Sequence, residues 1–544
     1  MISRKLSRQH IAIIIVAVLL VGSGLRLMRA ATNDFIFFDE GFYLNYNSRF
    51  YDLLETHPPD NWPDLQRAVS YWFRLSLGSG KALWFMISDA RFFFGAYRQW
   101  FVPKLIAALA GIMTLGLTFL FARRFFLRLS TATLSLALLA VLPSHVFYSR
   151  LALQETLSTF FFLAGFYFYL FPRGFGPRTF LSAAMFAGAY FTNYRLILLP
   201  IHILACAAYL SFTEKRMFSI RKIVWHILAF VALLVIIGNL DQGQNTVVTF
   251  AWMFHQSHLA AKQFHAINFL SYPYYLFRLE NFLFGLFFWM NLLFCWRRRD
   301  YRYLPFALVC LHMLMYSFAA EKGARYVCVI LPFAVMAASQ LGIELWERYP
   351  VRYARIIITC LALIMFLGLI QKSFDLASAR TDYRLATRYL LVRDPNVKVM
   401  ASQNHILNLY TPQRAQVIEI PHRFMTFIKR YQEGYRYLVI GPQAYISCGQ
   451  DDRHFQPPLR SFLGFIEQRI KPIKTFNHFN AVLMERFVFE HNENLYQSIR
   501  FLKQNDPAAR QLRIYDVGQC LAVMSRVIGR QTFDQQDFDY SMGD

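Results

Sequence analysis

Residues 10–29 have the sequence HIAIIIVAVLLVGSGLRLMR, in which the run from Ile11 to Leu25 contains no charged side chain. A helix needs about 20 predominantly apolar residues to cross the hydrocarbon core of a bilayer, so this stretch is long enough to span it. Its apolar run is also longer than expected for the core of a signal peptide. We therefore interpret the stretch as an uncleaved membrane anchor.

The composition of the whole chain favours the same class of protein. The 544 residues are 56% hydrophobic and 17% aromatic, and only 17% are charged. Soluble domains contain about 25% charged residues, and disordered chains are poor in aromatic residues. The net charge of +24 would suit a nucleic-acid binder, but a mean hydropathy of +0.30 would not. A polytopic membrane protein with its basic residues in loops remains.

Ten further apolar stretches bring the predicted number of membrane spans to eleven. They lie near residues 101–122, 129–148, 155–171, 179–194, 196–212, 223–240, 275–296, 303–320, 326–345 and 354–372. The stretches 155–171 and 179–194 are short and are joined by RGFGPR, so a re-entrant pair is an alternative there.

The basic residues predict the orientation of these spans. Alternate loops hold 19 Lys and Arg but only three acids, Glu214, Asp300 and Glu347. Such loops face the cytoplasm in membrane proteins. Eleven spans that start from a cytoplasmic N-terminus put everything after about residue 373 on the outer side.

This topology divides the chain into a membrane domain, residues 1–372, and an extracytoplasmic tail, residues 373–544. The first outer loop, residues 30–100, has aromatic amphipathic pieces that suit helices lying in the membrane interface. In the tail, strand-like runs such as VKVMAS and YRYLVIG alternate with helical runs such as HRFMTFIKRY, which predicts a small α/β domain. The tail also holds Cys448 and Cys520, for which a disulfide is one alternative.

Acidic side chains at two places near the outer membrane face are candidates for chemistry, because ionisable groups at membrane depth are costly. Asp39 and Glu40 lie in NDFIFFDEGFYLNYNSRFYD among apolar neighbours that favour a general base. Glu155 lies at the outer mouth of the fourth span. The alternatives are a helix N-terminal acid pair in an ordinary loop for the first place, and an ion pair or cap for the second.

Five cations are also expected at the outer face, although basic residues of membrane proteins are concentrated on the cytoplasmic side. They are Lys81, Lys104, Arg195, Lys322 and Arg325. Arg and Lys form charge-assisted hydrogen bonds with phosphate, so the group predicts a phosphate site. Interaction of single members with lipid headgroups is the alternative.

Five ordered pieces of the chain resemble the GT-C superfamily of polyprenyl-phosphate-sugar-dependent glycosyltransferases, in the branch of protein O-mannosyltransferases and lipid A aminoarabinose transferases. FFDEGFYLNYNSRFYD is similar to the acidic motif of that family's first loop, and YSRLALQETLSTFFF to its second acidic motif. The other three pieces are KALWFMISDARFFFGAYRQWFVPKLIAALAGIMTLGLTFLFARRFF, FAGAYFTNYRLILLP and EKGARYVCVILPFAVMAAS. Together they cover about residues 30–345.

The resemblance implies a GT-C fold with about 11 transmembrane helices and roles for particular residues. Asp39 matches the acid that acts as general base, and Glu40 its neighbour, which orients the acceptor or a divalent ion in some relatives. Glu155 matches the second acid, where relatives usually have Asp. The residues that match donor-phosphate positions are Lys81, Lys104, Arg195, Lys322, Arg325 and Tyr326. At Lys81, Ala82 and Leu83 replace the two prolines of the family's motif.

The expected function is therefore transfer of a sugar from a polyprenyl-phosphate donor to an acceptor hydroxyl of a lipid, glycan or protein, with inversion. The expected location is a bacterial or archaeal inner membrane, with the active site outside. No cofactor is required, because cations can hold the leaving phosphate; a divalent ion, if bound, would use Asp39, Glu40 and Glu155. The alternatives are an oligosaccharyl- or ligase-type transferase and a transporter or flippase of lipid-linked sugars.

Overall fold

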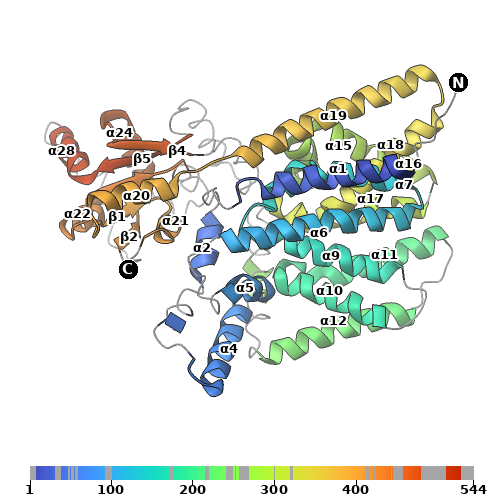
Figure 1. Cartoon of the computed structure of the whole chain (residues 1–544), viewed down its shortest axis with the longest axis horizontal. Helices are drawn as coiled ribbons and strands as arrows, with labels where there is room; N and C mark the ends of the chain where they lie inside the picture. Colours follow the sequence, from blue (N-terminus) through green and yellow to red (C-terminus); the bar gives the residue numbers. More distant parts are fainter. Residues whose placement is uncertain are drawn as a thin grey trace. The chain divides into compact units, whose positions relative to one another are not determined.

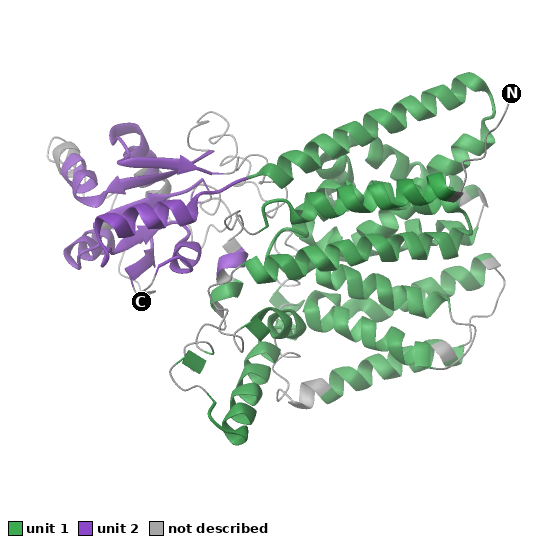
Figure 2. Ribbon diagram, viewed as in Figure 1, with its two compact units in different colours: residues 1–32, 43–379, 486–488 green, residues 33–42, 380–485, 489–544 purple. Residues whose placement is uncertain are grey.

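A computed structural model describes most of the chain. The described residues are 8–30, 38–46, 50, 54–55, 59–91, 101–171, 177–214, 220–240, 249–251, 253–255, 269–298, 300–318, 323–411, 416–421, 424–442, 444, 457–478 and 510–528. They group into two compact units (Figure 2). The first comprises Met1–Thr32, Tyr43–Ala379 and Arg486–Val488, and the second comprises Asn33–Phe42, Arg380–Glu485 and Phe489–Asp544.

The first unit is helical, and most of its long helices run along one common direction (Figure 1). Its helices in the N-terminal half are α1 (Arg8–Leu27), α2 (Phe38–Tyr46, shared between the units), α4 (Trp62–Leu77), α5 (Ala82–Asp89), α6 (Phe101–Phe126), α7 (Leu129–Ala140), α8 (Pro143–Tyr148), α9 (Glu155–Leu170), α10 (Pro177–Thr192), η2 (Tyr194–Leu198), α11 (Leu199–Glu214) and α12 (Ile220–Leu240). The later ones are α14 (Ser271–Tyr275), η4 (Leu276–Glu280), α15 (Phe282–Trp289), α16 (Asn291–Arg298), η5 (Tyr301–Tyr303), α17 (Leu304–Ser317), η6 (Ala324–Ile330), α18 (Leu331–Arg348) and α19 (Arg352–Ser378).

Five helical segments among the described residues are long and apolar enough to cross a membrane. They are Gln9–Leu27, Phe101–Phe126, Tyr194–Thr213, Ala324–Arg348 and Arg352–Arg393, and three shorter apolar helices are Leu129–Ala140, Ile223–Ile236 and Phe282–Cys295. The chain is thus an apolar multi-helix protein, as predicted, while the number of eleven spans stays a prediction.

The structure differs from the predicted spans mainly where a helix is interrupted. The predicted span 129–148 is divided into α7 and α8, because Pro143 begins a new helix and has no N–H to continue the old one. The predicted span 275–296 is divided into η4, α15 and α16. Helices α9 and α10 have 16 residues each, about 24 Å at 1.5 Å per residue, which is shorter than the apolar core of a bilayer.

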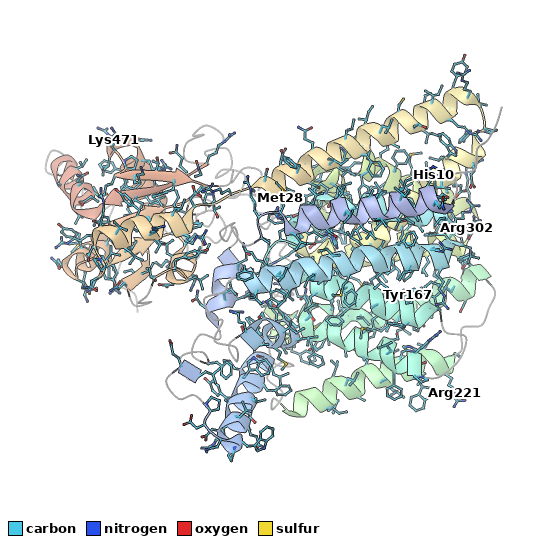
Figure 3. The ribbon with its side chains drawn as sticks, viewed as in Figure 1. His10, Met28, Tyr167, Arg221, Arg302 and Lys471 are labelled. Atoms are coloured by element: carbon cyan, nitrogen blue, oxygen red, sulfur yellow. The ribbon has the colours of Figure 1, made fainter. Side chains whose placement is uncertain are left out.

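Labelled residues identify the two ends of the bundle. Figure 3 shows His10, Arg221 and Arg302 at one end of the first unit and Met28 at the other. Tyr167, near the last turn of α9, lies toward the end that holds these basic residues. The first residue of α9, Glu155, therefore lies toward the opposite end.

Close packing of small residues brings the central helices together. A Cβ on Gly165 of α9 would lie 2.3 Å from the ring of Phe186 in α10, so only glycine fits at this contact. A Cβ on Gly22 of α1 would lie 2.8 Å from Leu115 of α6 and 3.0 Å from Ala140 of α7. Burial of aromatic side chains such as Phe162 and Phe166 between α9 and α18 completes this core.

The first span ends in a fully buried guanidinium, that of Arg26. It donates to the carbonyl oxygens of Gly22 (2.8 Å), Leu139 (2.9 Å) and Ala140 (3.0 Å), and it lies 2.7 Å from Nδ1 of His145. Because a buried charge is costly without partners, these contacts fix α1 against the end of α7 and against α8.

The second unit is an α/β sheet structure, which agrees with the prediction for the tail. Its described strands are β1 (Val399–Ala401), β2 (Val417–Glu419), β3 (Tyr437–Ile440), β4 (Lys474–Asn477) and β5 (Gln511–Asp516), in the order β2-β1-β3-β5-β4. β1 pairs in parallel with β2 and β3, and β5 pairs antiparallel with β3 and β4. Its described helices are α20 (Tyr383–Arg393), α21 (Asn404–Asn408), α22 (Phe424–Gln432), α24 (Pro457–Arg469) and α28 (Val517–Ile528).

The strands β2, β4 and β5 had no counterpart among the predicted elements, because two of them are short and partly exposed. Cys520 in α28 is a buried free thiol, and burial raises its pKa to about 12. Cys448, the other cysteine of the disulfide that the sequence left as an alternative, lies outside the described residues.

Candidate active site

A tight turn positions Lys81 at the start of α5. Gly80 has φ of 71°, a left-handed conformation that glycine adopts without strain. Its carbonyl oxygen accepts a hydrogen bond from the backbone N–H of Tyr194 (3.2 Å), which joins this turn to η2. The Lys81 ammonium lies 4.2 Å from the centre of the Tyr43 ring and 5.8 Å from that of Tyr194. Aromatic faces thus hold a buried cation.

Arg195 lies in η2, next to Tyr194, and is also buried. Its guanidinium carbon is 4.5 Å from the ring centre of Tyr326 and 5.5 Å from that of Tyr194. The Tyr316 hydroxyl donates to the carbonyl oxygen of Arg195 (2.7 Å). Arg325 adds a second guanidinium, whose carbon lies 5.6 Å from the centre of the same Tyr326 ring. The cations of η2 and η6 therefore gather at one tyrosine ring.

Two buried histidines hold the backbone of η6. Nε2 of His312 hydrogen-bonds to the carbonyl oxygen of Tyr326 (2.9 Å), which requires this nitrogen to donate. Nδ1 of His312 then accepts from Nε2 of His202 (3.0 Å). The pair links α11 and α17 to the segment that carries Arg325 and Tyr326.

Glu155 is the acid of this cluster. Its side chain is 2% exposed, and neither carboxylate oxygen has a hydrogen-bond partner in the described part of the chain. The carboxylate interacts electrostatically with Arg325, Arg195 and Lys81. Three cations around one acid leave an excess of positive charge in a buried place. Such an arrangement suits an anion, because charges at low dielectric interact strongly.

Lys104 lies in the first turn of α6 and is 1% exposed. It is three residues before Ala107, whose carbonyl oxygen accepts from the hydroxyl of Thr156 (3.0 Å). Residues three apart lie on one face of a helix, so Lys104 is on the face of α6 toward the start of α9.

Three further predicted residues are Asp39, Glu40 and Lys322. Asp39 and Glu40 lie in the first turn of α2, in the part that groups with the second unit, and Glu40 is buried. Lys322 lies outside the described residues. Among the residues that the structure describes, no three His, Cys, Asp or Glu are grouped so that they would hold a metal ion.

Other uncharged residues at the cluster were not predicted from the sequence, which pointed to charged side chains and to Tyr326. Tyr43 and Tyr194 contact the cations, and both stand close in sequence to a predicted residue. Gln154, directly before Glu155, is fully buried, and neither its amide oxygen nor its nitrogen has a hydrogen-bond partner in the described segments. These residues could have been found by considering the aromatic and amide side chains that lie close in sequence to the predicted charged residues.

Comparisons with known proteins give a family for part of the chain. Residues 16–175 match the model of the family described as dolichyl-phosphate-mannose-protein mannosyltransferase. No curated protein sequence matches the chain significantly.

Solved structures match the fold over most of the chain. ArnT from Cupriavidus metallidurans bound to undecaprenyl phosphate superposes with a TM-score of 0.55 at 12% identity, over 83% of this chain and 96% of ArnT. The apo state of ArnT gives a TM-score of 0.52 at 14% identity, over 80% of this chain and 94% of ArnT. The oligosaccharyltransferase AglB from Archaeoglobus fulgidus was solved in complex with an inhibitory peptide and a dolichol-phosphate. It gives a TM-score of 0.51 at 11% identity, over 80% of this chain and 70% of AglB. The predicted resemblance is thus confirmed: the chain has the fold of the GT-C membrane proteins, and its residues 16–175 match the mannosyltransferase branch in sequence.

Proposed function

We propose that the chain is a membrane glycosyltransferase that moves a sugar from a polyprenyl phosphate to an acceptor hydroxyl at the outer membrane face. The observation that carries the proposal is the cluster of the buried Lys81 and Arg195 and the half-buried Arg325, which all interact electrostatically with the buried Glu155. Glu155, the first residue of α9, lies toward the end of the bundle opposite to Tyr167, which Figure 3 shows on the side of Arg221 and Arg302. A lipid phosphate is the anion available at that depth. The similar proteins ArnT and AglB were solved with undecaprenyl phosphate and dolichol-phosphate, which supports this choice.

In the proposed reaction the acceptor oxygen attacks the anomeric carbon, and the bond from that carbon to the phosphate oxygen breaks. The phosphate keeps the electron pair, and the cations stabilise the charge that develops on it. Asp39 accepts the proton of the acceptor hydroxyl. One base suffices for a single displacement, so the anomeric configuration is inverted. Glu155 lies among the cations and limits how tightly they retain the product phosphate.

The test is transfer by the purified full-length chain, with polyprenyl phosphates of several sugars as donors and extracted envelope lipids, glycans and proteins as acceptors. Asp39→Asn should lower turnover by at least 100-fold, the lower end of what a general base contributes, and keep the affinity for polyprenyl phosphate. The matched control is Asp60→Asn, which changes an exposed acid of the same loop. Transfer by Asp39→Asn at the wild-type rate would show that the base is another residue. Movement of the lipid-linked sugar across vesicles without transfer would indicate a flippase.

A further inference from the structure

The sheet of the second unit has a polar cluster at one edge. The carboxyl ends of β1, β2, β3 and β4 meet there, because β4 and β3 both run antiparallel to β5. The chain leaves β1 toward β2 on one side, and the next strand, β3, lies on the other side of β1. Ligands of open α/β sheets bind outside the carboxyl ends at such a change of direction.

The residues that follow these strands are polar and closely packed. The backbone N–H of Gly441, after β3, donates to Oγ of Ser402, after β1 (3.0 Å). A Cβ on Gly441 would lie 3.1 Å from the hydroxyl oxygen of Tyr383. That hydroxyl is hydrogen-bonded to Nε2 of His478, after β4 (3.3 Å). Groups from three strands and α20 thus lie within a few ångströms of one another.

Gln403 is the side chain in this group whose hydrogen bonding is incomplete. It is 2% exposed, and its amide oxygen has no hydrogen-bond partner in the part of the chain that is described. A buried amide oxygen without a partner costs about 1–3 kcal/mol. A ligand with a hydroxyl donor would remove that cost.

The chemistry of the cluster favours a neutral ligand. Ser402, Gln403 and Tyr383 carry no charge at neutral pH, and Asp382 is already engaged by Arg380 and by the backbone N–H of Asn477. Burial lowers the pKa of the neighbouring His405, although Glu419 acts to raise it. Hydroxyl, amide, phenol and imidazole groups together are suited to a polyhydroxylated ligand, and they supply no charge for a phosphate.

The first loop of the chain approaches this edge within the same unit. A Cβ on Gly41 of α2 would lie 3.0 Å from the side chain of Ile406 and 3.1 Å from the backbone carbon of His405. A side chain at this position would require α2 or α21 to shift by a few tenths of an ångström or more. Gly41 directly follows Asp39 and Glu40, so the acid pair lies within two residues of a contact with α21, the helix after β1.

We propose that this edge, with Ser402, Gln403, Tyr383 and His478, binds the carbohydrate part of the acceptor beside the Asp39–Glu40 turn. The proposal rests on the proposed function, since it assigns the acceptor of that reaction to the class of glycans. The tail is then a substrate-binding domain.

The test is binding of the labelled full-length chain in detergent to an array of neutral oligosaccharides ending in mannose, galactose or N-acetylglucosamine, beside Ser- and Thr-containing peptides. We expect binding to at least one oligosaccharide, a loss of about tenfold in affinity with Gln403→Ala, and no change with Gln432→Ala, an exposed glutamine of α22. Asp39→Asn should bind like the wild type. Binding of peptides alone, binding of no oligosaccharide, or equal binding by Gln403→Ala would overturn the proposal. Thermal unfolding of each variant checks that the fold is kept.

A second variant separates this subsite from the transferase activity. Gly41→Val should push α2 away from α21 and lower the turnover of transfer, while oligosaccharide binding by the array persists. The array contains no donor lipid, so it measures binding alone. Oligosaccharide binding in the array, together with no transfer in the separate assay that contains donor, would refute the proposed function and leave the subsite standing. Transfer with an acceptor KM that Gln403→Ala does not change would refute the subsite and leave the proposed function standing.

Discussion

At the scale of the residue, Arg195 is the cation whose surroundings are best defined. Its guanidinium carbon lies 5.5 Å from the ring centre of Tyr194 and 4.5 Å from that of Tyr326, and the Tyr316 hydroxyl donates to its backbone carbonyl oxygen. Hydrogen bonds to charged groups contribute about 1.5–3 kcal/mol, so Arg195→Ala should weaken binding of polyprenyl phosphate by about 10- to 150-fold. Arg195→Lys should restore only part of the affinity, because an ammonium lacks the two-pronged geometry of a guanidinium.

The measurement is displacement of a fluorescent polyprenyl phosphate from the purified protein. Arg124→Ala is the matched control. The Arg124 guanidinium also packs over an aromatic ring, 4.7 Å from the centre of Phe171, but Arg124 lies in the last turn of α6, at the end of that helix away from Lys104. Unchanged binding by Arg195→Ala would remove this residue from the phosphate site.

Charged members of the site could be predicted from the sequence, whereas most uncharged members could not. Lys81, Arg195, Arg325 and Glu155 are visible in the sequence because a charge in an apolar context is conspicuous. The sequence does not show that they meet, since up to 244 positions separate them and proximity is a property of packing. Tyr43 and Gln154 were missed because aromatic and amide side chains are common in such helices.

At the scale of the element, the contact between α9 and α10 depends on Gly165. Overpacking a close contact costs about 1–3 kcal/mol, so Gly165→Ala should lower the free energy of unfolding by that amount. Gly116 of α6 offers a matched control, because a Cβ there would meet no atom within 4 Å. Gly116→Ala should stabilise the protein by about 0.5–1 kcal/mol through the higher helix propensity of alanine.

Thermal unfolding in detergent checks both changes. Equal midpoints for Gly165→Ala and Gly116→Ala would contradict the packing of α9 against α10. Hydropathy predicted where these helices lie but not this contact. The break between α7 and α8 at Pro143 also escaped the prediction, because an average over some 20 residues hides a single proline.

At the scale of the whole molecule, the basic residues of alternate loops predict orientation. Arg302 lies at the basic end of the bundle, and we expect that end to face the cytoplasm. Asn61, at the start of α4, lies in the loop expected outside. In a chain without its native cysteines, Arg302→Cys should react with an impermeant maleimide only in inverted vesicles, and Asn61→Cys only in intact cells. The reverse pattern would exclude an outer active site.

The buried guanidinium of Arg26 has a consequence for biogenesis. Its acceptors Leu139 and Ala140 and its neighbour His145 follow it by 113, 114 and 119 residues. At about 5–20 residues per second, a ribosome needs roughly 10 s to synthesise that length. During this interval the acceptors that α7 and α8 supply do not yet exist, and of the four contacts of the guanidinium only the one with Gly22, in α1 itself, can form. The final packing of α1 against α7 and α8 therefore has to follow the synthesis of both helices.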